Sequence, residues 1–91
     1  MRPADPGDRL RAGVGALKGD LEAVTRQFSR NLVEARGWEG LTQKQLSERS
    51  SVTQREVARL EYAQRCPRLD KVVRLADALG IQVRDLLYGI E

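Results

Sequence analysis

The sequence predicts an all-α fold of five helices, preceded by an N-terminal segment for which both disorder and helix are open. Apolar residues recur at spacings of three and four through most of the chain, and no stretch alternates apolar and polar residues as a strand does. Two helix-start signals lie close together, at Thr42 and Thr53. With 91 residues, the chain can form one domain with a small core that needs no disulfide or metal.

The first 22 residues are predicted to form an N-terminal arm, distinct from the domain over residues 23–91. Residues 1–8 contain two prolines, a glycine and two aspartates, a composition typical of disorder. The apolar residues that follow have a heptad-like spacing: Leu10, Val14, Leu17, Leu21, Val24 and Phe28. Three glycines between residues 13 and 19 each weaken a helix by about 1 kcal/mol. We therefore expect a helix here only if it packs, either on its own domain or on a second copy.

The first helix of the domain is predicted over residues 21–36. Its apolar residues share one face at helical spacing: Val24, Phe28, Leu32 and Ala35. Gly37 is expected to end this helix, and residues 37–40 to form a loop. Trp38, in that loop, is expected to cap the edge of the core.

Two short helices follow, at about residues 42–49 and 53–61. Each start combines a capping box with a hydrophobic staple: Thr42 with Gln45 and Leu41 with Leu46 at the first, Thr53 with Glu56 and Val52 with Val57 at the second. Only residues 50–52 separate the two helices. A three-residue turn between two short helices is the geometry of a helix-turn-helix motif, which we place at residues 42–61.

Two further helices complete the predicted fold. They are separated from the motif by an irregular basic loop over residues 62–68. Residues 69–79 form an amphipathic helix, which Gly80 ends. Residues 83–88 form a short last helix, which Gly89 ends.

The composition argues against several classes of function. The single cysteine, Cys66, cannot form an intrachain disulfide, and the chain has no histidine to help build a zinc site. Because no nucleophile is paired with a base and no phosphate-binding loop is present, we expect no enzyme activity, no metal and no cofactor. No apolar run approaches the roughly 18 residues of a membrane span, and the N-terminus has no signal core. A cytoplasmic protein is the expectation.

The positive charge is concentrated in one part of the chain. The net charge is +3, from 16 basic and 13 acidic residues. Residues 42–71 contain seven basic and four acidic residues, leaving nine of the 16 basic and nine of the 13 acidic residues for the rest of the chain. The whole excess therefore falls on the motif and the loop after it, as expected for a nucleic-acid-binding surface. Taken alone, an excess of this size is also what an ordinary solvated surface carries.

From Phe28 to Tyr88 the sequence resembles the lambda-repressor-like family, the Cro/cI or Xre-type helix-turn-helix proteins. The positions that match the family signature are Gln43, Leu46, Ser47, Ser51, Val52, Thr53, Val57, Leu60 and Glu61. Residues 61–69 are similar to the loop that follows the signature, and residues 75–81 and 85–87 to the closing helices. The resemblance implies a five-helix DNA-binding domain.

Three features depart from the family pattern. Ser51 stands where the family prefers glycine, at a turn position that is usually left-handed, with a cost of about 1 kcal/mol. Tyr62–Ala63 replaces the usual Asn-Gly, so we expect a tighter or differently aimed loop. The loop after the first helix is longer than usual. It is therefore open whether Arg36 or Arg30 pairs with Glu61, as an arginine of the family's first helix does.

The resemblance places the second motif helix in the major groove, with its N-terminal residues on base edges. We assign the base contacts to Gln54, Arg55 and Arg59, because arginine can bind guanine and glutamine can bind adenine through paired hydrogen bonds. Contacts to the DNA backbone are expected from the first motif helix and the loop after the second: Gln43, Lys44, Tyr62, Arg65 and Arg68. Solubilising charge explains Lys44 and Arg65 equally well, and partial burial explains Tyr62.

Double-stranded DNA is the first expected partner, bound by a homodimeric repressor on a pseudo-palindromic operator. The dimer interface is predicted at the apolar end of the chain: Ile81, Val83, Leu86, Leu87 and Tyr88. One alternative is an antitoxin-type autorepressor whose N-terminal segment, residues 1–28, folds on a partner toxin. Another is a coactivator-like adaptor that uses this fold for protein contacts, although the basic motif helix counts against it.

Overall fold

The computed structural model describes residues 17–90, with the side chains of residues 20–90. This part of the chain contains five helices and no strand: α2 (Leu17–Glu39), α3 (Gln43–Ser50), α4 (Gln54–Glu61), α5 (Leu69–Leu79) and α6 (Val83–Leu86). The prediction of an all-α fold is confirmed. Most of the predicted arm, and with it most of the segment weighed as a toxin-binding element, lies outside the described residues.

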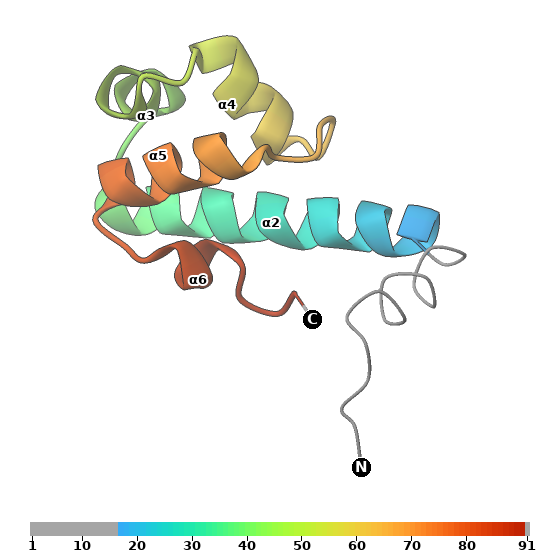
Figure 1. Cartoon of the computed structure of the whole chain (residues 1–91). Helices are drawn as coiled ribbons and strands as arrows, with labels where there is room; N and C mark the ends of the chain where they lie inside the picture. The colour runs from blue at the N-terminus through green and yellow to red at the C-terminus, as the bar shows by residue number, and fades with distance from the viewer. Residues whose placement is uncertain (1–16, 91) are drawn as a thin grey trace.

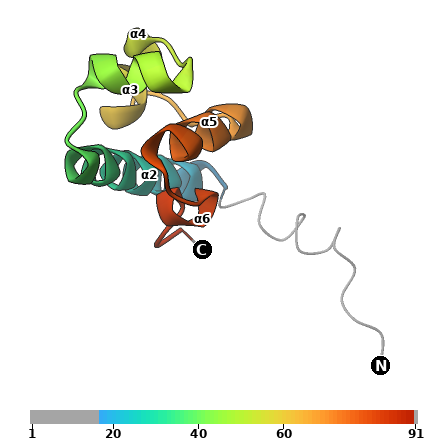
Figure 2. The ribbon, with the colours of Figure 1, turned by 90° about the vertical axis from the view of Figure 1, so that its left-hand side faces the viewer.

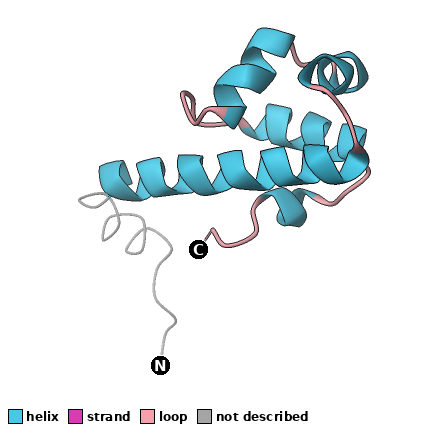
Figure 3. Cartoon of the chain, turned by 180° about the vertical axis from the view of Figure 1, so that it is seen from behind, coloured by secondary structure: helices cyan, strands magenta, loops and turns pink. Residues whose placement is uncertain are grey.

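The longest helix, α2, runs through the middle of the domain (Figure 1). α3 and α4 lie on one side of α2 and α6 lies on the opposite side, in both views of the ribbon (Figures 1 and 2). α5 packs against α2, α3 and α6. Only short loops join the helices (Figure 3). The two motif helices are therefore carried on one side of α2, with the end of the chain on the other.

One apolar core lies between these helices. Its buried residues come from every helix of the described chain or from the adjoining loops: Phe28, Leu32, Leu41, Leu46, Val52, Val57, Leu60, Val72, Leu75, Ala76, Leu79 and Leu86. Full burial of a Val, Leu or Phe side chain stabilises a fold by about 1.5–3 kcal/mol. Because Leu46, Val57 and Leu60 belong to this core, packing rather than intrinsic propensity holds the two short motif helices.

The N-terminal end of α2 extends beyond the predicted residue 21, to Leu17. One helix therefore runs across the boundary predicted between residues 22 and 23. Of the heptad stripe, Phe28 is buried and Val24 is half-buried, while Leu21 is exposed. Among the stripe residues whose side chains the structure describes, only the C-terminal ones join this chain's core, and packing on a second copy stays a prediction.

The C-terminal end of α2 also differs from the prediction. Gly37 does not end the helix, which continues to Glu39. A glycine inside a helix costs only about 1 kcal/mol, whereas the reversal of the chain needs a left-handed residue, and Gly40 provides it with φ +66°. The Gly40 amide donates to the Gly37 carbonyl (3.1 Å), as in a Schellman motif. Trp38 is 84% exposed, so the expectation that it caps the core edge is wrong.

The two C-terminal helices follow the prediction in part. α5 has the predicted bounds and ends at Gly80, whose φ of +68° and hydrogen bond to the Asp77 carbonyl (3.1 Å) close the helix. α6 is shorter than predicted, because the residues after Leu86 form turns.

Asn31 of α2 attaches this last segment to the body. Its Nδ2 donates to the carbonyls of Leu86 and Tyr88, both at 2.8 Å, and its Oδ1 accepts from Gln27 Nε2 at 3.0 Å. Gly89 packs directly on Gln27, since a Cβ at that glycine would lie 3.3 Å from Gln27 Cδ. These contacts hold α6 and the residues after it against the side of α2 that faces away from the motif.

Candidate nucleic-acid interface

The start of α3 has a complete capping box. The Gln45 amide donates to Thr42 Oγ1 (3.1 Å), and the Thr42 amide donates to Gln45 Oε1 (2.8 Å), which confirms the predicted cap. The first amides of a helix have no carbonyl partner within the helix. Together with the positive end of the helix dipole, the amides of Gln43 and Lys44 form a suitable place for a phosphate oxygen.

The start of α4 has only half of the predicted capping box. Thr53 Oγ1 accepts from the Glu56 amide (3.1 Å), as expected. The Glu56 carboxylate does not return to the Thr53 amide; its Oε2 lies 3.6 Å from Nη1 of Arg65 instead. A charged partner in the following loop therefore replaces the local hydrogen bond of the box.

The turn between α3 and α4 contains the expected left-handed residue. Ser51 has φ 60° and ψ 20°, and its amide donates to the Ser47 carbonyl (3.1 Å). The buried Ser50 accepts a hydrogen bond from the Val52 amide at its Oγ (3.2 Å). The turn thus keeps the geometry that glycine favours, at a cost of about 1 kcal/mol.

A second left-handed residue, Ala63, follows the end of α4. Its φ is 55°, and the next amide, of Gln64, donates back to the Arg59 carbonyl (2.9 Å). This pattern is that of a Schellman helix end, in which glycine is usual. The Tyr62–Ala63 dipeptide therefore makes a sharp reversal with a glycine-type backbone.

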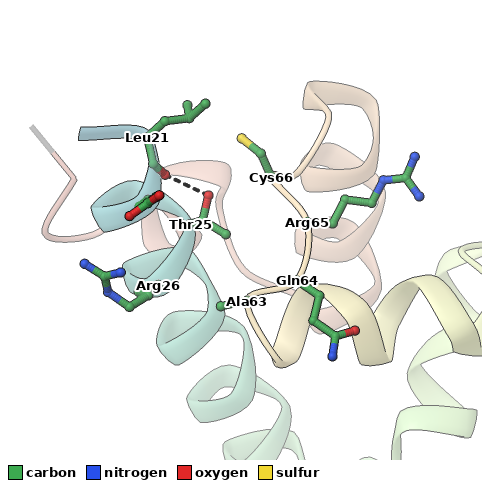
Figure 4. Close-up of a pocket in the computed structure, with 8 residues that line it drawn as sticks. Leu21, Thr25, Arg26, Ala63, Gln64, Arg65 and Cys66 are labelled. Atoms are coloured by element: carbon green, nitrogen blue, oxygen red, sulfur yellow. Dashed lines mark hydrogen bonds between the residues drawn. The ribbon is translucent and has the colours of Figure 1, made fainter. Parts of the chain in front are cut away.

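The loop after this reversal lies against the first half of α2. Residues 63–66 and the side chains of Leu21 and Thr25 line a groove of about 480 Å³ (Figure 4). The Thr25 hydroxyl is used within the helix, where it donates to the Leu21 carbonyl (2.8 Å). Cys66 is exposed and carries a free thiol. The groove thus lies between α2 and the loop that follows α4.

Glu61, at the end of α4, is the centre of a buried polar network. Its side chain is only 3% exposed. Arg36 of α2 donates to both carboxylate oxygens, from Nε to Oε2 (2.6 Å) and from Nη2 to Oε1 (2.9 Å). Gln43 Nε2 of α3 donates to the same Oε1 (3.0 Å), and the Ser29 hydroxyl donates to the Glu61 carbonyl. This one residue joins α2, α3 and α4.

Arg36, rather than Arg30, is therefore the arginine that pairs with Glu61. Its Nη1 also donates to the Leu41 carbonyl at the start of the motif (2.9 Å). Hydrogen bonding to Glu61 raises the pKa of the Arg36 guanidinium above its ordinary value, against the smaller opposing effect of burial. Removing one partner of such a pair leaves an uncompensated charge inside the protein.

The face of α4 that points away from the core carries the residues predicted to contact bases. Val57 and Leu60 are buried, as expected, whereas Gln54 and Arg55 are exposed. Arg59 is half-buried. Within the described chain, no ion pair engages Arg55 or Arg59. The first turn of α4 thus presents an amide and a guanidinium, and Arg59 lies further back.

The residues predicted to contact the DNA backbone differ in their availability. Gln43 is half-buried and its side chain donates to Glu61, so the backbone amide of Gln43 rather than its side chain is available at the start of α3. Lys44 is exposed, and so is Tyr62, which rules out core burial of that ring. Arg68 Nε lies 3.5 Å from Asp70 in a solvent-exposed pair, which is worth little and leaves the guanidinium accessible.

The predicted dimer interface requires one correction. Leu86 has no exposed surface, because it belongs to this chain's own core, and it cannot meet a second copy. Ile81 and Val83 are half-buried against the same core. Leu87 is 36% exposed and Tyr88 77% exposed. Only part of the apolar C-terminal sequence remains accessible, since α2 and α5 cover the rest.

Residues 17–90 contain neither a metal-binding cluster nor a membrane-spanning helix. They have no cluster of His, Cys, Asp and Glu side chains able to hold a metal ion. None of their helices combines the length and the apolar character needed to cross a bilayer.

Two side-chain contacts of the domain, those of Asn31 and Gln43, could not be predicted from the sequence. Asn31 binds backbone carbonyls, which leave no trace in the sequence of their owners. The contact of Gln43 with the DNA backbone stays a prediction, and the structure adds a hydrogen bond from its side chain to the Glu61 carboxylate.

The comparison with known families agrees with this geometry. Residues 32–86, more than half of the chain, match the family described as Helix-turn-helix. Nothing matched in the comparisons with curated proteins and with solved structures. The matched range includes the two capped helices, the Ser51 turn and the Arg36–Glu61 pair. The chain therefore belongs to the helix-turn-helix family of the lambda-repressor-like, Cro/cI or Xre type.

Proposed function

We propose that this protein is a sequence-specific DNA-binding transcriptional regulator, a repressor that binds its operator as a dimer. The observation that carries the proposal is the outer face of α4, where Gln54 and Arg55 are exposed on a helix that Glu61 fixes to α2 and α3. Side chains that read base edges must be polar, exposed and held in a narrow range of positions. The family adds the expectation that this helix enters the major groove.

Each polar group has a distinct role in this proposal. Arg55 binds the O6 and N7 atoms of a guanine and Gln54 binds an adenine edge, while Arg59 makes a further base contact from the next turn of α4. The amides at the start of α3, together with Lys44, hold a phosphate. Arg65 and Arg68 contact the backbone from the loop after α4. Phosphate contacts set the register, and base contacts set the sequence.

The dimer follows from the small number of base pairs that one such domain can reach. Because Leu86 is buried, we propose Val83 and Leu87 as the centre of the interface. Sedimentation should show a dimer at tens of micromolar, in free solution or on DNA. A monomer under both conditions would contradict this part of the proposal.

Selection of bound sequences from a random DNA pool tests the function. The expected result is a short site with two-fold symmetry, its half-sites about 10 base pairs apart. The affinity should fall steeply as salt is added, since each phosphate contact releases counterions. A pool that stays random after selection, for the parent and for Arg55→Ala alike, would exclude sequence-specific recognition.

A further inference from the structure

A second surface lies on the side of α2 that faces away from the motif (Figures 1 and 2). A groove of about 300 Å³ runs there between the C-terminal half of α2 and α6. Ala35 and Ile81 contribute its apolar lining, with Trp38 and Tyr88. None of these residues is among those assigned to DNA. The groove therefore stays open when α3 and α4 are occupied.

The two aromatic residues of this groove are unusually exposed. Trp38 is 84% exposed and Tyr88 77%, although the core accepts residues as large as phenylalanine. Leaving rings of this size in water forfeits the gain of burying them. Tryptophan and tyrosine are also the residues most enriched at the energetic centres of protein interfaces. The rings are thus placed for a partner rather than for the fold.

The charge around the rings is of one sign. Glu34, Glu39 and Asp85 line the groove, and no basic residue does. Glu34 and Glu39 are exposed and take part in no ion pair with another described residue. One carboxylate oxygen of Asp85, Oδ2, accepts a hydrogen bond from the Gln82 amide at the start of α6 (2.9 Å). A two-fold contact of this groove with its own copy would bring carboxylates together, which argues for a cationic occupant.

We propose that this groove binds a basic segment of a partner protein while the opposite side of the domain is on DNA. Lysine or arginine side chains pack their aliphatic stems and charged heads against Trp38 and Tyr88, a cation–π arrangement. Their positive charges are attracted to the carboxylates of Glu34 and Glu39. Such a surface would link bound DNA to a second protein. This inference does not depend on the proposed base contacts, since the groove exists whether or not α4 reads DNA.

The single tryptophan of the chain provides a site-specific probe. We would titrate the full chain, without DNA, with a synthetic amphipathic peptide of lysine and leucine and follow Trp38 fluorescence. The expected result is a saturable change that weakens as salt rises. A peptide of the same pattern with glutamate in place of lysine should give no change. Saturable binding of the glutamate peptide would show that apolar contact alone fills the groove and would overturn the proposal.

Charge-neutral variants test the role of the carboxylates. Glu34→Gln with Glu39→Gln should weaken the lysine peptide about threefold to tenfold, as expected for the loss of two surface attractions. Asp77→Asn, an exposed carboxylate on α5, is the matched control and should bind as the parent does. Equal binding by the double variant, or equal weakening by Asp77→Asn, would overturn the proposal. So would sedimentation in which Trp38→Ala dissociates a dimer, since a second copy would then occupy the groove.

Discussion

Two polar side chains of α2, Arg36 and Asn31, attach opposite sides of the molecule by different physical means. Arg36 binds a buried carboxylate and so fixes the DNA-reading side, through Glu61. Asn31 donates to two backbone carbonyls and so fixes the C-terminal side. Removing one partner of a buried ion pair lowers the stability of a protein far more than removing one partner of a neutral hydrogen bond. The side proposed to bind DNA, which needs precise positions, is therefore fixed by the interaction whose partial removal costs more, the Arg36–Glu61 ion pair.

Of the variants that test this comparison, Arg36→Ala is expected to have the largest effect on stability. Glu61 would stay buried with Gln43 as its only side-chain donor, which should lower the free energy of unfolding by about 3–5 kcal/mol. Urea unfolding measures the change. The double variant Arg36→Met with Glu61→Gln removes both charges and should recover much of the loss. Unchanged unfolding of Arg36→Ala would show that this pair does not hold α4.

The same pair predicts a simple dependence on pH. The pKa of Arg36 is raised in the folded protein, so its contribution is complete below the pKa of the unfolded state. The contribution is lost only as the pH rises through the folded value, in strongly alkaline solution. The stability difference between the parent and Arg36→Ala should therefore stay constant across the neutral range, measured by urea titrations. A difference that shrinks between neutral and mildly alkaline pH would contradict this account.

Asn31→Ala is expected to have a smaller effect, confined to the other side. It removes two donors from the carbonyls of Leu86 and Tyr88, which should cost about 1–3 kcal/mol in urea unfolding. Because the Glu61 network is untouched, the folded variant should bind DNA like the parent, while its groove at α6 should bind the lysine peptide less well. If DNA affinity fell as far as in Arg36→Ala, the two sides would not be held independently.

Ala63→Gly is expected to have the smallest effect, and of opposite sign. Glycine relieves the left-handed backbone at φ 55°, so the free energy of unfolding should rise by up to about 1 kcal/mol. Ala23→Gly is the matched control, since the same chemical change in an exposed turn of α2 should destabilise by about 1 kcal/mol. Two changes of the same sign would show that position 63 is not strained.

The motif could be predicted from the sequence because its signals are local. A cap such as that of Thr42 depends on partners within three residues, and the left-handed turn at Ser51 is implied by the resemblance to the family. The predicted hydrogen bond from the Thr53 amide to the Glu56 side chain is absent because a partner outside the local segment intervenes. Arg65, distant in sequence, lies close to that carboxylate and competes for it.

Contacts between distant segments could not be predicted in the same way. The choice between Arg36 and Arg30 depends on where α2 ends, and Gly37 indicated the wrong end, because a glycine can remain inside a helix at modest cost. The groove beside Trp38 depends on where α6 docks, since residues of α6 and its flanking turns line it. That docking rests on Asn31 and on backbone carbonyls, which every residue possesses and no sequence pattern marks.

The most direct test of the central claim, that α4 reads bases while the start of α3 holds the backbone, compares two variants on one set of DNA sites. Affinities of the parent, Arg55→Ala and Lys44→Ala are measured on the selected operator and its single-base variants, at several salt concentrations. Arg55→Ala should lose about 1–3 kcal/mol and stop discriminating at one base position, whereas Lys44→Ala should weaken all sites alike and reduce the salt dependence. The reverse pattern, or binding that does not respond to salt, would contradict the account.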